Sequence, residues 1–425
     1  MPRDLAFDIL NATLHSRQPF DEAFDQPERS AKLEPRDRGF AFNLVITTLR
    51  HLGQIDDVIS QCLEKSLPPK AKFARTILRL GICQLLFLET PAHAAVSTSV
   101  DLAERQNQGP YKKLINAVLR RVGREAAKLT SGQDAAKLNT PDWLWQSWCQ
   151  AFGENTARQI AAAHLTPPEL DLSVKADAAS WAQKLGGRLL PTGGIRLPVS
   201  TNVRELTGYQ DGAWWVQDAA ASLPAQLFGQ DLAGQKIADI CAAPGGKTAQ
   251  LLAAGAEVIA LDRSEKRLQT LSENLQRLSL TAEIICTDAA SWRPDELLDG
   301  VLLDAPCSST GTIRRHPDVA HLKRPEDANH AGQAQLRLLN GAAEMVKPGG
   351  KIVFATCSLQ PEEGPDVIQA FLAEQPNWQR QAIDPSEAGG RAEFVTAAGD
   401  LRTLPCHLAE FGHMDGFFAA RLTQT

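Results

Sequence analysis

The sequence contains no pair of cysteines in C-x-x-C spacing, no long apolar run and no secretory signal at its start. Its eight cysteines are therefore not arranged as a zinc site or a thioredoxin motif, and we expect free thiols and no bound metal. A membrane-spanning helix needs roughly 20 apolar residues, whereas the most apolar stretch, residues 77–88, contains Arg79. These absences predict a cytoplasmic protein that does not enter the membrane.

The composition is that of an ordinary globular protein. The chain has 425 residues, of which 43% are hydrophobic and 22% are charged. These values exclude a disordered, collagen-like or coiled-coil chain. At roughly 100–200 residues per domain, the length predicts two to four domains.

The net charge of −6 is unevenly distributed along the chain. Residues 1–140 hold 20 basic and 16 acidic residues, and residues 111–128 alone hold six basic residues and one acidic residue. Local basic patches matter more for nucleic-acid binding than the total charge does. A solvated helix face would show the same pattern. The candidate RNA contacts are Lys112, Lys113, Arg120, Arg121, Arg314 and Arg315.

Three stretches of the chain differ in their hydrophobic pattern, which predicts a multidomain protein. Residues 1–140 show only helical periodicity, so we expect an all-α bundle. Residues 141–230 mix helices with short extended pieces and predict a small α+β domain. Residues 231–425 alternate strands with helices and predict a doubly wound, parallel α/β sheet. The expected strands of that sheet are 236–241, 257–261, 283–286, 300–304 and 351–355, with a final strand pair near 416–422 and helices at 265–278 and 333–346.

The first of these strands runs into a loop of small residues, DICAAPGGKT, at positions 239–248. Small residues let the backbone approach a ligand, and the following helix N-terminus favours an anionic group. The end of the motif is similar to a phosphate loop, but that loop requires glycine where this chain has Cys241. The glycines also do not form G-x-G-x-x-G. Nucleoside triphosphates and dinucleotides are therefore both disfavoured.

Carboxylates come at or just after the ends of the following strands, namely Asp262, Asp288 and Asp304. An acid in the position of Asp262 suits the hydroxyl groups of a ribose, and Asp288 could accept a hydrogen bond from an exocyclic amine such as that of adenine. Each aspartate alone could be a loop or helix cap. Together they favour a nucleoside with a carboxylate-bearing tail, which is S-adenosylmethionine.

Two cysteines follow the fourth and fifth strands, in the sequences DAPCSSTG and ATCS. Amino-group methyltransferases usually carry an aromatic clamp where this chain has Cys307. A thiolate is suited to another reaction, because its addition to carbon 6 of a pyrimidine makes carbon 5 nucleophilic. Asp304 could supply the acid near N3 that assists the addition. The spacing does not say whether Cys307 or Cys357 attacks, and two inert core thiols are the alternative.

These motifs resemble those of a known family. DICAAPGGKT, DAPCSSTG with the following IRRHPD, ATCS and the terminal MDGFF are similar to the RNA (cytosine-5) methyltransferases. Residues 1–140 resemble the NusB-like domain of the Sun/Fmu branch, which modifies bacterial 16S rRNA. Residues 141–230 resemble the small RRM-like RNA-binding domain of the family, and residues 231–425 resemble its Rossmann-like catalytic domain.

The resemblance implies S-adenosylmethionine as the cofactor, Cys357 as the nucleophile and Cys307 as the group that assists product release. It implies as target cytosine 967 of 16S rRNA, modified by a monomer before or outside the complete small subunit. One departure is Gly364, where the family commonly has asparagine after Pro-Glu-Glu. The implied cofactor-binding positions are Cys241, Ala242, Ala243, Pro244, Gly245, Gly246, Lys247, Asp262, Asp288 and Asp304.

Other functions stay open at this point. The substrate could be another RNA such as tRNA, or DNA. A NusB-like domain can also bind RNA and proteins without catalysis, so a non-catalytic ribosome-assembly factor is the alternative from another class. A P-loop ATPase is a third, weakened by Cys241.

Overall fold

The computed structural model describes residues 1–26, 33–198 and 202–424. By their contacts these residues form two compact units. Unit 1 comprises Met1–Thr166 and Ile313–Lys323, and unit 2 comprises Pro167–Thr312 and Arg324–Thr425. The division into three domains at residues 140 and 230 remains a prediction. The contacts place a late segment of the chain, residues 313–323, in unit 1.

The described residues of unit 1 form helices and no strands, as the periodicity of residues 1–140 predicts. On α8 the apolar residues Ile115, Val118, Leu119 and Val122 recur at helical spacing and are all buried, so one face of the helix packs into the core. The helices are α1 (Pro2–Ser16), α2 (Phe20–Phe24), α4 (Pro35–Arg50), α5 (Leu52–Cys62), α6 (Lys72–Leu86), α7 (Ala92–Arg105), α8 (Lys112–Thr130), α9 (Ala135–Leu138), α10 (Asp142–Phe152), α11 (Glu154–His164) and, from the late segment, α16 (Val319–Leu322).

The late segment of unit 1 is held by hydrogen bonds to the N-terminal helices. The backbone N–H of Phe20 donates to Asp318 Oδ2 at 2.9 Å. The guanidinium of Arg50 donates to the carbonyl of Arg314 at 2.7 Å, and His321 Nε2 lies 2.9 Å from the Leu49 carbonyl. The chain that follows the DAPCSSTG motif is therefore part of the helical unit.

Unit 2 begins with a small antiparallel sheet of strand order β2-β3-β1-β4, which confirms the predicted α+β character. Its strands and helix are β1 (Leu170–Val174), α12 (Ala178–Leu185), β2 (Arg188–Leu189), β3 (Ile195–Leu197) and β4 (Trp214–Val216). Trp214 is fully buried with Leu172 and Ile195 in the core of this sheet.

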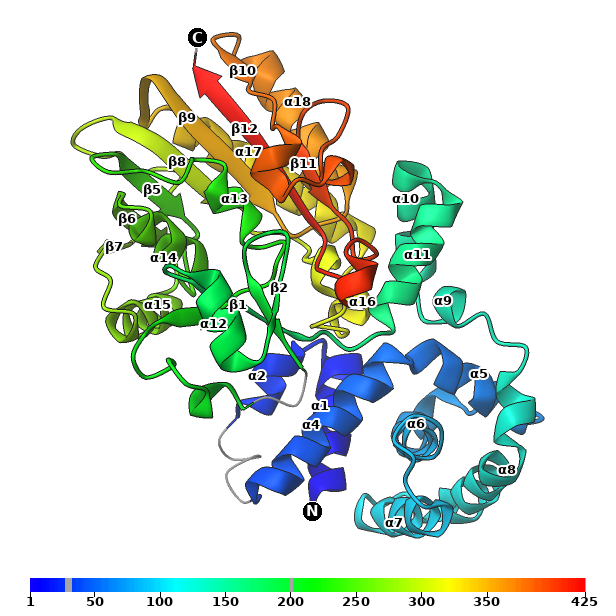
Figure 1. Cartoon of the computed structure of the whole chain (residues 1–425). Coiled ribbons are helices and arrows are strands. Elements are labelled where there is room, and N and C mark those ends of the chain that lie inside the picture. Colours follow the sequence, from blue (N-terminus) through cyan, green and yellow to red (C-terminus); the bar gives the residue numbers. More distant parts are fainter. Residues whose placement is uncertain (27–32, 199–201, 425) are drawn as a thin grey trace. The chain divides into compact units, whose positions relative to one another are not determined.

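The remainder of unit 2 is a large sheet flanked by helices (Figure 1). The strand order is β10-β12-β9-β8-β5-β6-β7, and β11 pairs with β12. The elements are α13 (Leu223–Gln226), β5 (Lys236–Ile240), α14 (Gly246–Ala253), β6 (Glu257–Asp262), α15 (Glu265–Arg277), β7 (Glu283–Cys286), β8 (Leu298–Asp304), α17 (Pro325–Ala343), β9 (Val346–Thr356), α18 (Pro365–Glu374), β10 (Trp378–Arg380), β11 (Leu401–Thr403) and β12 (Phe417–Gln424).

The order of the central strands decides where a ligand can bind. From β5 the chain continues outward through β6 and β7, and then crosses to β8 on the other side of β5. Ligands of open α/β sheets bind at the carboxyl ends of the strands, at the point where the order reverses. The loops after β5, β6, β8 and β9 are therefore the candidate site.

The sequence predicts the parallel strands of this sheet closely, but it did not indicate β10, and two further differences concern β12 and one helix. β12 runs antiparallel to β9, so the sheet is parallel only from β7 to β9. The helix expected at 333–346 begins at Pro325, because proline fits the first helical position and the Asp327 carboxylate accepts from the backbone N–H of Arg324. No helix in the described ranges is long and apolar enough to cross a membrane.

Candidate active site

The loop after β5 folds into a tight cradle of small residues. Cys241 and Gly245 both adopt positive φ, at 62° and 100°, and α14 starts at Gly246. The backbone N–H of Ala242 donates to the carbonyl of Leu261 at 3.0 Å, which ties the loop to the end of β6. The cradle therefore places the backbone and the N-terminus of α14 at the carboxyl end of the sheet.

A buried carboxylate beneath the loop holds α14 against β5. The Thr248 hydroxyl donates to Asp239 Oδ2 at 2.6 Å, and Asp239 is fully buried. Burial raises the pKa of Asp239 to about 7. Burial likewise raises the pKa of the Cys241 thiol to about 12, so Cys241 is a neutral thiol that contributes shape to the loop.

The three predicted aspartates come at or just after the ends of three strands of the sheet, β6, β7 and β8. Asp262 ends β6, is 5% exposed, accepts from the backbone N–H of Ser264 at 3.0 Å and pairs with Arg267 at 3.0 Å. Asp288 is exposed after β7 and accepts from the backbone N–H of Ala290. Both therefore make local bonds, and because a carboxylate has about four acceptor sites, each can accept a further hydrogen bond from a ligand.

The residues present suit the cofactor expected from the sequence. The cradle lacks large side chains, so a nucleoside can approach its backbone. A carboxylate at the end of β6 matches the hydroxyl donors of a ribose, and the N-terminus of α14 matches an anionic tail. The donor set thus fits S-adenosylmethionine.

Lys247, the last residue of the cradle, forms an ion pair with Asp304 at the end of β8. Lys247 Nζ donates to Asp304 Oδ2 at 2.8 Å and lies 4.9 Å from the centre of the Phe417 ring. Burial opposes the charge of Lys247, but the carboxylate of Asp304 outweighs it, and the pKa of Lys247 is raised. The pair is a charged, hydrogen-bonded donor group beside the end of β8.

The two predicted cysteines meet. Asp304 and Ala355 are paired across β8 and β9, so the loops that follow the two strands emerge together. The Sγ atoms of Cys307 and Cys357 lie 3.3 Å apart, and the Ser309 hydroxyl lies 3.8 Å from the Cys307 sulfur. This arrangement confirms the predicted proximity of the thiols.

The proximity splits the acidities of the two thiols. The hydrogen bond from Cys357 lowers the pKa of Cys307, despite burial. The same hydrogen bond, together with burial and the repulsion of Cys307 and Asp304, raises the pKa of Cys357 well above its usual value. Of the two thiols Cys307 is therefore the more acidic, and Cys357 is the one that retains its proton more strongly.

A further acidic residue, Glu363, contacts the loops of both cysteines, and the sequence pattern did not indicate it. The Glu363 carboxylate is fully buried. It accepts from the backbone N–H of Ser308 at 2.6 Å, from the Ser358 hydroxyl at 2.5 Å and from the Ser308 hydroxyl. The available signal was the serine that follows each cysteine in the two motifs.

A second contact joins the cysteine loops to the MDGFF motif. The backbone N–H of Gly311 donates to the Cys357 carbonyl at 2.8 Å, and that of Gly416 donates to the Gly311 carbonyl at 2.8 Å. A Cβ atom on Gly311 would come within 2.1 Å of the Gly416 carbonyl oxygen. These two glycines permit three strand-end loops to pack against one another.

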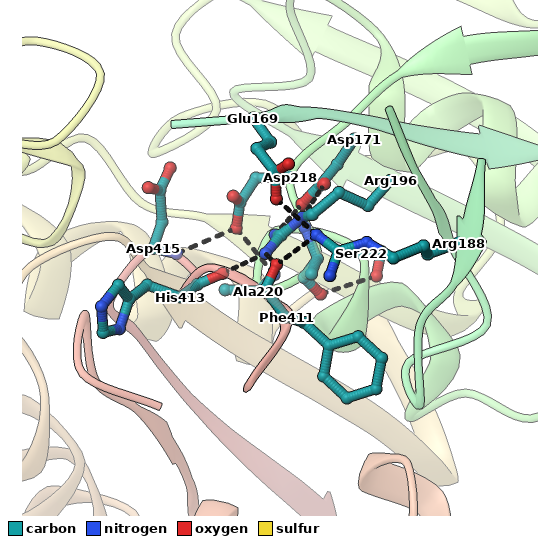
Figure 2. A network of polar contacts seen from close by, with 11 residues as sticks. Glu169, Asp171, Arg188, Arg196, Asp218, Ala220, Ser222, Phe411, His413 and Asp415 are labelled. Carbon is teal, nitrogen blue, oxygen red and sulfur yellow. Dashed lines mark hydrogen bonds and ion pairs between the residues drawn. The ribbon is translucent and has the colours of Figure 1, made fainter. Parts of the chain in front are cut away.

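The segment before Gly416 is fixed by the polar network shown in Figure 2. Arg196 of β3 and Asp171 of β1 form two hydrogen bonds of 2.6 Å, and each side chain is 1% exposed. Arg196 also donates to the carbonyls of Phe411 and His413. Asp218 accepts from the backbone N–H of Asp415 at 3.3 Å. The small sheet thereby anchors the segment that packs on the cysteine loops.

The predicted RNA contacts differ in their surroundings. Lys112, Lys113, Arg120 and Arg121 all lie on α8. Arg120 is exposed. Lys112 pairs with Glu104 at 2.9 Å, and Arg121 pairs with Glu125 at 3.2 Å. The prediction for Arg314 is corrected: its side chain is 1% exposed within the helical unit, so it offers no surface to RNA. Arg315 is partly exposed and stays a prediction.

Two family models match the chain. The model described as 16S rRNA methyltransferase RsmB/F matches residues 230–423, and that of the NusB family matches residues 1–124. Curated relatives named ribosomal RNA small subunit methyltransferase B include one from Vibrio cholerae, 34% identical over 94% of this chain and 92% of its own. Another, from Pseudomonas putida, is 36% identical over 99% of this chain and 98% of its own.

Solved structures agree with the fold. The crystal structure of PH0851 has a TM-score of 0.75 at 22% identity and covers 100% of this chain and 99% of its own. NSun6 from Pyrococcus horikoshii, solved with SFG, has a TM-score of 0.57 at 18% identity and covers 67% of this chain and 98% of its own.

Fold, site and relatives together define a methyltransferase that uses S-adenosylmethionine and carries a NusB-type helical domain. The chain belongs to the ribosomal RNA small subunit methyltransferase B family.

Proposed function

We propose that the protein methylates carbon 5 of a cytosine in 16S rRNA through a covalent bond between Cys357 and carbon 6 of the base. The observation that carries the proposal is the pair of Sγ atoms 3.3 Å apart, at the ends of the neighbouring strands β8 and β9. The names of the relatives support ribosomal RNA of the small subunit as the substrate.

The cradle of residues 241–247 would hold the cofactor, with Asp262 on its ribose and Asp288 near its base. When bound, S-adenosylmethionine supplies the methyl group that carbon 5 takes. The positive φ angles of Cys241 and Gly245, together with the neutral state of the Cys241 thiol, keep the cradle open.

Attack requires a thiolate at Cys357, yet the pKa of that thiol is raised, so its proton must be transferred as it attacks. We propose that the Cys307 thiolate takes this proton across the 3.3 Å contact as the sulfur of Cys357 bonds to carbon 6. The electron pair of the carbon 5–carbon 6 double bond then shifts into the ring. The Lys247–Asp304 pair, a hydrogen-bonded donor beside the end of β8, supplies the proton that N3 gains.

Release reverses the addition. Once carbon 5 bears both hydrogen and methyl, a base removes its proton, the double bond re-forms, the Cys357 thiolate leaves and N3 returns its proton to the Lys247–Asp304 pair. Cys307 is the base of this step, after passing the proton it took earlier to solvent. The lowered pKa of Cys307 supports this role, because a group that must accept protons near neutrality needs a populated thiolate.

We propose that α8 contacts the RNA backbone. A groove of about 560 Å³ lies between α7 and α8. Its lining includes His93, Asn116, Arg120 and Arg124, and Arg120 and Arg124 are exposed. Cationic side chains along a groove bind phosphates and release counterions. The protein would act in the cytoplasm, as a monomer, on rRNA before or outside the complete small subunit, with cytosine 967 as the target.

The test is methylation of protein-free 16S rRNA with radiolabelled S-adenosylmethionine, followed by mapping of the label to a nucleotide and to a ring position. Label on carbon 5 of one cytosine is the expected result. Label on tRNA alone would redirect the substrate, and cofactor binding without transfer to any RNA would favour the assembly-factor function.

A further inference from the structure

We infer that Glu363 is a positioning residue whose single buried carboxylate holds the Cys307 and Cys357 loops in register. Its role in turnover rests on the proposed function, whereas the contacts that define it do not. The residue acts on the two sulfur atoms through the serine that follows each cysteine.

The contacts bring both loops to one side chain. Ser308 gives Glu363 two hydrogen bonds, from its backbone N–H at 2.6 Å and from its hydroxyl, and Ser358 gives one from its hydroxyl at 2.5 Å. The two serine oxygens are themselves 3.1 Å apart, and Thr310 Oγ1 lies 3.3 Å from that of Ser358. Glu363 is 55 residues from Ser308 and five from Ser358.

Such a carboxylate is costly to bury unless its oxygens are hydrogen-bonded. Here the hydrogen bonds come from the residues adjacent to the cysteines, so satisfying Glu363 also fixes the two backbone segments that carry the sulfur atoms. Hydrogen bonds to charged groups are about twice as strong as neutral ones. Loss of the carboxylate should therefore release both loops together.

Other contacts keep these loops attached to the sheet. Gly311 donates its backbone N–H to the Cys357 carbonyl, Gly416 donates to the Gly311 carbonyl, and Leu359 donates its backbone N–H to Thr310 Oγ1 at 2.9 Å. Because these bonds do not involve Glu363, its loss should loosen the spacing of the sulfur atoms without removing the loops from the site.

The charge and the tether of Glu363 act on Cys307 in opposite directions. The hydrogen bond from Cys357, which depends on the spacing, lowers the pKa of Cys307, while burial and the negative charge of Glu363 raise it. Glu363→Gln removes the charge but keeps the length of the side chain. Glu363→Ala removes the tether as well.

The experiment measures alkylation of Cys307 and Cys357 by iodoacetamide against pH, by peptide mass spectrometry on the full chain without RNA. For Glu363→Ala we expect the midpoint of Cys307 to rise, since the larger, spacing-dependent effect is weakened. For Glu363→Gln we expect it to fall. The adjacent Glu362→Gln is the matched control and should match the wild type.

Turnover is measured on the same variants. Misplacement of a reacting group by about 1 Å can lower a rate about 100-fold, so kcat of Glu363→Ala should fall by about that factor while cofactor affinity stays within about twofold. A midpoint and a kcat equal to those of the wild type would overturn the inference. If Glu363→Ala does not fold, Ser358→Ala and Ser308→Ala replace it, since each removes the hydroxyl hydrogen bond of one loop to Glu363. The same changes in the Cys307 midpoint and in kcat are then expected.

The two proposals fail in different ways. A wild-type protein that methylates no RNA, but whose Cys307 midpoint shifts as expected in the Glu363 variants, contradicts the proposed function and supports the positioning role. A wild-type protein that methylates cytosine, with Glu363 variants unchanged in midpoint and kcat, contradicts the positioning role alone.

Discussion

Cys307 and Cys357 are 50 residues apart in the chain, yet their sulfur atoms are 3.3 Å apart in the structure. They extend from neighbouring parallel strands, β8 and β9, and their contact lowers the pKa of Cys307 and raises that of Cys357. Groups whose titrations are coupled act as a unit. Replacing Cys307 and replacing Cys357 should therefore have different effects on the reaction, and these effects should not be additive.

The first prediction separates the two thiols. Cys357→Ala cannot form the bond to carbon 6, so it should give inactive protein and free RNA. Cys307→Ala retains the attacking sulfur and removes the contact that raises the pKa of Cys357, so that solvent can take the Cys357 proton. This variant should transfer the methyl group and then stall, because the base for the carbon 5 proton is missing. A denaturing gel should then show protein joined to RNA for Cys307→Ala only.

The opposite pattern, with an adduct for Cys357→Ala and none for Cys307→Ala, would exchange the two roles and keep the mechanism. Methylation retained in both variants without any adduct would rule out the covalent mechanism. Cys286→Ala, which changes an exposed thiol outside the pair, is the control for loss of a cysteine.

The second prediction concerns the cofactor. Asp262→Ala should weaken S-adenosylmethionine binding about tenfold or more, because hydrogen bonds to a charged group contribute about 1.5–3 kcal/mol and about 1.4 kcal/mol is tenfold. Isothermal calorimetry measures the change. The exposed Asp295→Ala is the control, since Asp295 lies outside the predicted cofactor positions. An affinity of Asp262→Ala equal to that of the control would remove Asp262 from the site.

The third prediction concerns the network of Figure 2. Arg196→Met leaves the Asp171 carboxylate buried without its partner, which costs about 3–5 kcal/mol of unfolding free energy. Arg188→Met, which breaks a neighbouring but exposed pair with Glu169, should cost at most about 1 kcal/mol. Urea unfolding monitored by tryptophan fluorescence compares the two, and equal costs would mean that the buried pair does not stabilise the fold.

The fourth prediction concerns RNA. Replacing Arg120 and Arg124 by alanine should weaken RNA binding and reduce the slope of log K against log salt by about 1–2, since each lost phosphate contact removes roughly one unit. Cofactor affinity should not change. Replacing Arg121, which is paired with Glu125, should change the slope less. An RNA affinity and salt slope equal to those of the wild type would show that α8 is only a solvated helix.

The fifth prediction concerns pH. Burial raises the pKa of Asp239 from 3.8 to about 7, so between these values the folded state holds a proton that the unfolded state has released. This contribution to stability is present below about pH 4 and falls as pH rises to about 7, by up to about 4 kcal/mol. Asp239→Asn should lose that dependence, whereas the exposed Asp231→Asn should retain it. Urea midpoints at about pH 5 and about pH 8 measure the difference, and an equal change of midpoint with pH in the wild type and both variants would contradict it.

Local pattern was sufficient to predict the all-helical first part, most strands of the large sheet and the loops at their ends. Strand periodicity and helix spacing depend on near neighbours in the chain, and the carboxyl ends of parallel strands necessarily share one edge of a sheet. For this reason the cofactor cradle and the meeting of Cys307 with Cys357 could both be inferred from residue order.

The tertiary structure decided what depends on distant residues. Arg314 follows the DAPCSSTG motif and carries a charge typical of an RNA contact, yet its segment packs in the helical unit and buries it. Glu363 joins two loops whose serines are 50 residues apart, and Arg196 bonds to a carbonyl 215 residues away. Hydrogen bonds of this kind leave no periodic signal, because their partners are set by how strands cross and loops pack, and only the folded chain brings them within bonding distance.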